Sequence, residues 1–212
     1  MSQQRIYSIP EEVLNATTHG IGVGLGITAL VIMTIFSARQ HDAWKIVSSV
    51  LFGCSIILLY LSSTLYHSLS RTRIQRILKT LDHSSIFILI AGTYTPFCLV
   101  SLRGDWGWTL FGLVWGLALF GLFFKLLFIY RFHVVSMMIY LLMGWAVVIA
   151  FKPLIHDLPF DGLMWLMAGG LCYTLGVIFY AWKSMPFTHS LWHLFVLAGT
   201  ICHFFAVLFF VI

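Results

Sequence analysis

Charged side chains are scarce in this chain. Asp, Glu, Lys and Arg make up only 9% of its 212 residues, whereas hydrophobic residues make up 60%. Soluble globular domains carry roughly a quarter charged residues, so the composition excludes an ordinary soluble domain. Cysteine is sparse as well: the four cysteines fall inside apolar segments and form no CxxC pair. We therefore expect them to be packing residues without disulfides.

Long polar segments are also missing, because seven apolar runs fill most of the chain. Their lengths suit membrane helices, which need about 20 apolar residues, whereas strands of a membrane barrel would show about ten alternating residues each. The sequence thus predicts an all-α integral membrane protein, a seven-transmembrane-helix bundle. Short connections and an N-terminal tail of about residues 1–14 predict a single domain over residues 1–212. The expected helices cover residues 17–37, 46–68, 82–101, 107–127, 134–151, 162–182 and 190–211.

Basic residues are divided unevenly between the two membrane faces. Eight of the twelve lie on the side of the N-terminus, and half of those eight lie in the connection after the second helix. The positive-inside rule then places the N-terminus in the cytoplasm and the C-terminus outside. The eight are Arg5, Arg71, Arg73, Arg76, Lys79, Lys125, Arg131 and Lys183.

Nothing in the sequence indicates binding of nucleic acid or a nucleotide. The net charge of +5 is carried by the connections of a membrane protein, so it is no sign of a nucleic-acid partner. Glycines at positions 20, 22, 24 and 26 follow no strand, and their spacing indicates close helix packing. We expect membrane lipids as the surroundings of the chain, and the oligomeric state stays open.

Polar residues that can bind a metal gather at one end of the apolar runs. His67 closes the second run, Asp82 opens the third, and His189 and His193 open the seventh. Helices of alternating direction bring these ends to one membrane face. His189 and His193 are four residues apart, so they share a helix face and could chelate one transition metal. Alone, this spacing is weak, because histidines are common near the ends of membrane helices.

The combination predicts a zinc site. Three histidines with an open fourth position for water are a catalytic zinc arrangement, and imidazole favours zinc over magnesium or calcium. We predict Zn²⁺ on His67, His189 and His193. Asp82 would orient or deprotonate the water, and Ser63 would supply a supporting hydrogen bond. The alternatives are that Asp82 caps its helix and that Ser63 bonds its own backbone.

The order of three motifs resembles the progestin and adipoQ receptor (PAQR) superfamily, specifically its bacterial haemolysin III branch. The resemblance runs from about residue 10 to the C-terminus and also includes Ala91–Pro96 in the third helix. The motifs are Glu12-x2-Asn15-x3-His19, then Ser63-x3-His67 followed by Asp82, and finally His189-x3-His193.

The resemblance implies a seven-helix bundle in the bacterial inner membrane, with zinc on the three histidines. It also implies lipid chemistry, since the superfamily is linked to ceramidase-like hydrolysis and the bacterial branch to membrane lipid homeostasis. We therefore predict a zinc-dependent hydrolase of a lipid amide or ester, with the lipid substrate in the bundle cavity. One alternative is a non-enzymatic, zinc-stapled sensor of membrane state. A haemolytic pore is less favoured, because these helices are very apolar.

Other polar residues in the runs give weaker signals. For Asn15 and His19 we favour interfacial or capping roles over a place in the site. His203 lies 14 residues beyond His189, roughly 21 Å along a straight helix, which is too far for the same ion. For His203 we favour an interhelical hydrogen bond, with a place in a cavity wall as the alternative.

Overall fold

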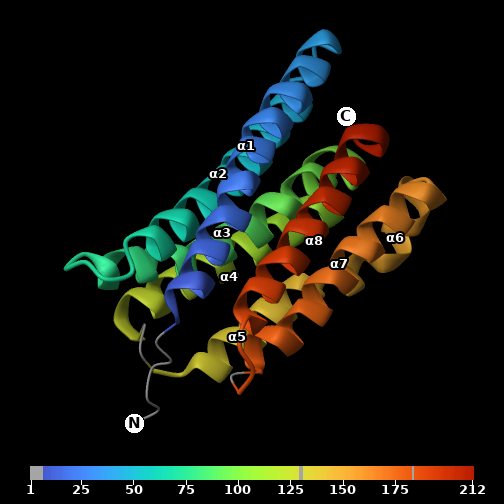
Figure 1. Ribbon diagram of the computed structural model, residues 1–212. Helices are drawn as coiled ribbons and strands as arrows, with labels where there is room; N and C mark the ends of the chain where they lie inside the picture. The colour runs from blue at the N-terminus through green and yellow to red at the C-terminus, as the bar shows by residue number, and fades with distance from the viewer. Residues whose placement is uncertain (1–6, 129–130, 183) are drawn as a thin grey trace.

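The computed structural model describes residues 7–128, 131–182 and 184–212, apart from the side chain of His133. Every regular element in these ranges is helical (Figure 1). Seven spans in the described ranges are long and apolar enough to cross a membrane, which confirms the predicted fold class. The elements are α1 (Ile9–Arg39), α2 (Ala43–Ser68), α3 (Gln75–Pro96), η1 (Phe97–Ser101), α4 (Asp105–Phe128), α5 (His133–Gly144), η2 (Ala146–Ala150), α6 (Phe151–Asp157), α7 (Phe160–Ala181) and α8 (Thr188–Phe210).

The first helix begins at Ile9, well before the expected residue 17. Ser8 caps it: the Ser8 hydroxyl accepts from the backbone N–H of Glu11, and the Glu11 carboxylate accepts from the N–H of Ser8. This reciprocal capping box stabilises a helix start inside a polar segment. Residues 9–14 of the expected tail are therefore helical, and Glu12 belongs to α1.

The third helix also begins early, at Gln75. Asp82 therefore lies about two turns inside α3, and it does not cap that helix. This observation removes the main structural alternative for Asp82.

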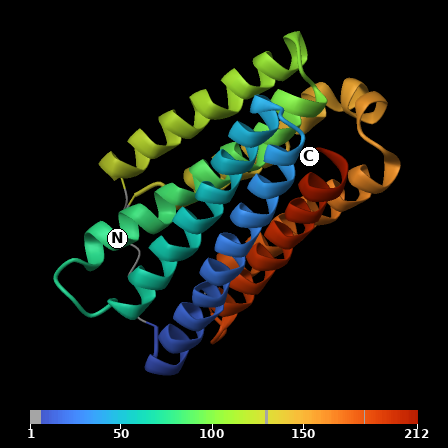
Figure 2. The ribbon, with the colours of Figure 1, turned by 90° about the horizontal axis from the view of Figure 1, so that it is seen from above.

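The helices α1 and α2 run antiparallel and approach closely. A Cβ atom added to Gly22 would lie 2.7 Å from the ring of Tyr60, and one added to Gly26 would lie 2.8 Å from Ile56. Such contacts are closer than side chains tolerate, so the glycines permit the approach. On its other side α1 packs against α8, so α1 lies between α2 and α8 (Figure 2).

Two spans depart from regular α-helix, the third at its end and the fifth near its middle. After Pro96, α3 continues as the π-helical turn η1, and the fifth span changes to the 3₁₀ turn η2 after Gly144. The Tyr94 hydroxyl donates to the carbonyl of Gly144 at 2.7 Å and accepts from the N–H of Val147 at 2.9 Å. Tyr94 thus satisfies backbone groups that the break in the fifth span releases.

A cavity of about 140 Å³ lies among α3, α5, α7 and α8. A single water needs roughly 10–15 Å³ measured in this way, so the cavity can hold a molecule far larger than one water. Asp82 and His19 line one end of it, and His203 lines the wall deeper in the bundle. Most of the other lining side chains are apolar, among them Leu89, Phe97, Leu110, Leu154, Leu166 and Val196.

Candidate metal centre

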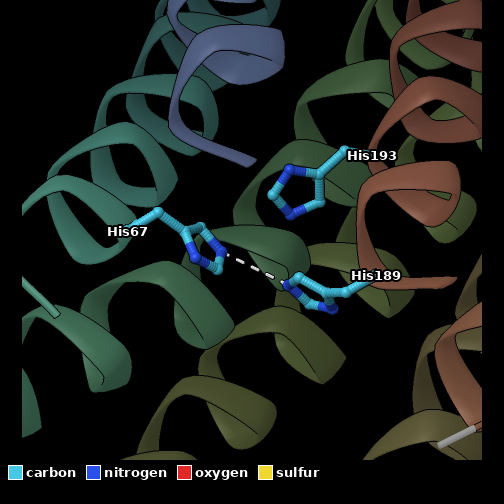
Figure 3. A group of neighbouring side chains, drawn as sticks. All are labelled: His67, His189 and His193. Carbon is cyan, nitrogen blue, oxygen red and sulfur yellow. Dashed lines mark hydrogen bonds between the residues drawn. The ribbon is translucent and has the colours of Figure 1, made fainter. Parts of the chain in front are cut away.

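Three buried histidines meet at the histidine end of the bundle, the end at which α2 finishes and α8 begins. His67 comes from the last turn of α2, and His189 and His193 come from the first turns of α8 (Figure 3). One ligand nitrogen from each lies within 4.8 Å of the other two. The structure therefore brings together the three residues that the sequence predicts as metal ligands.

The spacing within the triad suits a small tetrahedral metal centre. The Nε2 atoms of His67 and His189 are 3.3 Å apart. Zinc–nitrogen bonds of about 2.0–2.1 Å in a tetrahedron separate neighbouring nitrogens by about 3.3 Å. The rings surround a common point, with centroid separations of 5.1, 5.1 and 4.6 Å. We conclude that the three histidines are close enough together to hold a metal ion.

A carboxylate on α1 orients His67. The Glu12 carboxylate lies 2.6 Å from His67 Nδ1. Because an ionised carboxylate only accepts, Nδ1 carries the proton and donates it to Glu12. The lone pair of His67 is then on Nε2, the nitrogen that faces His189. Metal-binding histidines characteristically donate their second ring nitrogen to such a partner.

The backbone and a hydroxyl of α1 orient His193 in the same way. His193 Nδ1 lies 3.3 Å from the carbonyl oxygen of Asn15 and 3.4 Å from the hydroxyl of Thr18. The carbonyl can only accept, so Nδ1 donates and Nε2 carries the lone pair. That Nε2 is buried and has no hydrogen-bond partner. An unsatisfied buried acceptor is costly, and a metal ion would satisfy it.

Further contacts hold the start of α1 against the start of α8. The Asn15 side-chain carbonyl accepts from the Ser190 hydroxyl at 2.5 Å. The Glu11 carboxylate accepts from the backbone N–H of Phe187 at 3.0 Å, just before α8 begins. The ring of Tyr7 stacks on His189 with centroids 4.9 Å apart. The first turns of α1 therefore fix the helix that carries two of the three histidines.

The two residues predicted to support the chemistry are buried but lie outside the triad. Asp82 is buried and lines the end of the cavity, with its carboxylate 3.3 Å from His83 Nδ1. Ser63 is buried one turn before His67 on α2, and its hydroxyl has no hydrogen-bond partner. Among the described residues, the group close enough to share a metal ion consists of the three histidines and does not include Asp82. The roles of Asp82 and Ser63 stay predictions.

His19 is buried beside this centre, whereas the sequence favoured an interfacial or capping role for it. Its ring stacks on His193 with centroids 3.6 Å apart and planes within 9°. Both of its ring nitrogens are buried without hydrogen-bond partners, and the residue lines the cavity. His19 thus stands beside both the triad and the cavity.

Sequence reasoning also undervalued Glu12, Asn15 and Thr18. The signal was present in the spacing of Glu12, Asn15 and His19, because steps of three and four residues place them on one helix face. These residues share a face only if the helix begins before Glu12, as it does in the structure.

Comparison with known proteins agrees with this architecture. The family model described as "Haemolysin-III related" matches residues 7–204. The chain is 51% identical to the "Hemolysin-3 homolog" of Bacillus subtilis (strain 168) over 205 residues, covering 97% of this chain and 96% of that protein. It is 47% identical to "Hemolysin-3" of Bacillus cereus, covering 96% and 93%.

A more distant relative is the human "Monocyte to macrophage differentiation factor". It is 27% identical over 203 residues, which cover 93% of this chain and 83% of that protein. The family match over residues 7–204 spans all three motifs identified in the sequence. The chain therefore belongs to the haemolysin III-related family and is a multi-pass bacterial membrane protein.

Proposed function

We propose that the protein is a zinc-dependent hydrolase that cleaves an amide or ester bond of a membrane lipid at the cytoplasmic side of the inner membrane. Membrane lipid homeostasis would be its physiological role. The observation that carries the proposal is the convergence of three buried imidazoles beside an apolar cavity whose end holds a carboxylate. Three histidine ligands leave a zinc coordination position open, which is typical of catalytic sites.

The residues divide into ligands and orienting groups. His67, His189 and His193 would hold the ion, while Glu12 and the Asn15 carbonyl keep two of the rings in the correct tautomer. Zinc in such a site supplies Lewis acidity, which polarises a carbonyl and lowers the pKa of water to about 7. The affinity of imidazole for transition metals favours zinc over harder cations.

Asp82 is the proposed general base. Its carboxylate is buried at the end of the cavity, and it is not grouped with the histidine nitrogens. It would accept a proton from the attacking water and pass it to the leaving amine or alkoxide. The Ser63 hydroxyl, which lacks a partner, would donate a hydrogen bond near the ligands.

The cavity would hold the hydrocarbon chain of the lipid. Its walls are mostly apolar, and Asp82 and His19 line the end nearest the triad. A chain lying in the cavity would therefore present its carbonyl group toward Asp82. Apolar walls with a few polar groups at one end are typical of sites that bind amphiphiles.

A second candidate is a zinc staple in a protein that senses membrane state. It is favoured by one observation, that His67, His189 and His193 do not themselves line the cavity. A metal on the triad would tie α2 to α8 and stabilise the bundle. A pore, suggested by the names of the Bacillus relatives, fits less well, because a water-filled path needs polar groups along its length and the cavity walls are mostly apolar.

One experiment separates these candidates. The metal content of detergent-purified protein is measured by elemental mass spectrometry, and turnover is measured on ceramide and on lipid esters, for the unaltered chain, Asp82→Ala and His193→Ala. Hydrolysis requires about one zinc per chain, with metal largely kept and turnover abolished in Asp82→Ala. Full activity of Asp82→Ala would exclude the proposed base. Zinc without turnover, lost together with folding in His193→Ala, would favour the staple.

A further inference from the structure

The ring of Tyr7, a residue that precedes the first helix, lies against the metal centre. Tyr7 comes directly before Ser8, the residue that caps α1. Its ring stacks on His189 with centroids 4.9 Å apart, and it meets His67 edge-on with centroids 6.1 Å apart. The residue is partly exposed. Tyr7 therefore contacts two of the three candidate ligands and also reaches the surface.

The two histidines that Tyr7 contacts are the outer pair of the triad. His67 is one residue from the end of α2, and His189 is one residue from the start of α8. His193 lies one helical turn deeper, about 6 Å along α8, and there the ring of His19 stacks on it. Tyr7 thus covers the side of the triad that faces the water at the histidine end of the bundle.

Tyr7 is held differently from the other rings around the triad. Five rings from outside the triad contact its members in the described part of the chain: Tyr7, His19, Tyr66, Tyr180 and Trp192. The last four lie within α1, α2, α7 and α8, where close packing restricts their movement. The capping box fixes α1 only from Ser8 onward. Rotation about the backbone of Tyr7 can therefore swing its ring away while every helix stays intact.

The opposite route to the triad is unfavourable for an ion. On that side lies the cavity, where Asp82 and His19 line one end and most of the other side chains are apolar. A divalent ion that passed through the cavity would lose much of its hydration among apolar groups, which is costly. We therefore expect metal ions to enter and leave at the end that Tyr7 covers.

From this arrangement we infer that Tyr7 is a lid over the histidine triad, which sets the rate at which a metal ion enters and leaves without setting its affinity. The inference rests on the proposed function in one respect, that the triad holds zinc. A ring that covers the centre equally before and after binding slows entry and release by the same factor. The Kd, which is the ratio of the two rates, then stays the same.

The lid and the Glu12 carboxylate therefore have separable effects. Glu12 keeps the proton on His67 Nδ1 and so favours the form of the ring that binds metal. Its loss should weaken the affinity. Loss of the Tyr7 ring should instead speed exchange, so that competing ligands in the water at this end of the bundle remove zinc sooner.

The test measures zinc exchange on the full chain in detergent. Release is followed by stopped-flow fluorescence after zinc-loaded protein is mixed with an excess of a fluorescent chelator. Entry is followed after metal-free protein is mixed with zinc, and the Kd comes from a competition titration. For Tyr7→Ala we expect both rates to rise about tenfold, the worth of one aromatic ring pair, with the Kd unchanged.

Tyr7→Phe is the matched control, because it keeps the ring and removes only the hydroxyl. It should exchange zinc as slowly as the unaltered chain. Glu12→Ala is the second control and should show the other pattern, a weaker Kd. If Tyr7→Ala does not fold, Tyr7→Leu replaces it, because leucine keeps an apolar side chain but has no ring to stack on His189.

The outcomes separate this inference from the proposed hydrolase. Unchanged rates in Tyr7→Ala, a Kd that weakens as far as in Glu12→Ala, or fast exchange in Tyr7→Phe would overturn the lid and leave the hydrolase standing. An unaltered protein that binds no zinc would overturn both. Faster exchange in Tyr7→Ala at constant Kd, in a protein that hydrolyses no lipid, would support the lid and remove the hydrolase.

Discussion

The two ends of the bundle each contain a histidine paired with a carboxylate, at almost the same distance. At the histidine end His67 and Glu12 are 2.6 Å apart, with side chains 0% and 14% exposed. At the opposite end His156 and Asp157 are 2.7 Å apart, with side chains 87% and 37% exposed. Distance and residue type therefore do not distinguish the two pairs, whereas burial does.

The difference in burial changes what each pair can do. His156 and Asp157 are neighbours in the sequence and face solvent, where such pairs contribute little to stability. Glu12 and His67 join α1 to α2, and placing them there requires desolvation that a hydrogen bond offsets only in part. A buried pair that also directs a second nitrogen toward two more histidines fits the proposed metal site, in which metal-binding histidines donate their other nitrogen to such a partner.

Removal of a triad histidine should have the largest effect on zinc content. We expect His193→Ala to lose zinc, because two ligands on different helices remain and the affinity should fall by more than the roughly 10- to 100-fold cost of losing an orienting partner. The exposed His156→Ala is the control and should keep about one zinc per chain. Elemental mass spectrometry of folded protein decides the matter. Equal zinc in both variants would show that the triad is not the metal centre.

A smaller effect is expected from the carboxylates of the two pairs. Glu12→Ala removes the group that keeps the proton on His67 Nδ1, so zinc affinity should fall about 10- to 100-fold. The measurement is a competition titration with a zinc chelator at constant pH. Asp157→Ala removes the corresponding partner of His156 and should leave the affinity unchanged. An unchanged affinity in Glu12→Ala would mean that α1 only packs against the centre and does not orient it.

Sequence predicts the fold well because bilayer thickness sets the length of each apolar run. The early start of α1 escapes this reasoning, since its capping box, Ser8 with Glu11, lies in a polar segment that hydropathy does not register. Hydropathy also fails to predict the break in the fifth span. Its change to a 3₁₀ turn after Gly144 depends on the Tyr94 hydroxyl from another helix.

The candidate site is predictable in part, because the order and direction of the helices follow from the sequence. Alternating helix directions bring His67, His189 and His193 to one depth whatever the packing, so their shared depth follows from topology, whereas their meeting in one cluster depends on how the helices pack. The roles of Glu12 and His19 depend instead on α1 lying between α2 and α8, which no hydropathy pattern gives.

The smallest predicted effect is at the opposite end and concerns stability alone. The Asp42 carboxylate accepts from the backbone N–H groups of Trp44 at 2.8 Å and Lys45 at 3.4 Å, so it caps α2. Asp42→Ala should lower the free energy of unfolding by about 1 kcal/mol, the usual cost of a lost cap, without changing zinc affinity. Asp42→Asn is the matched control, since its side-chain oxygen still accepts and should keep most of the stability.

Thermal unfolding in detergent, followed with and without added zinc, measures this effect, and the chelator titration measures the affinity. Asp42 lies at the first turn of the helix whose last turn carries His67. A cap at one end influences a site at the other only if α2 shifts as a rigid rod. A zinc affinity that falls in Asp42→Ala as far as in Glu12→Ala would therefore show that the two ends are coupled through α2, and that burial alone does not separate them.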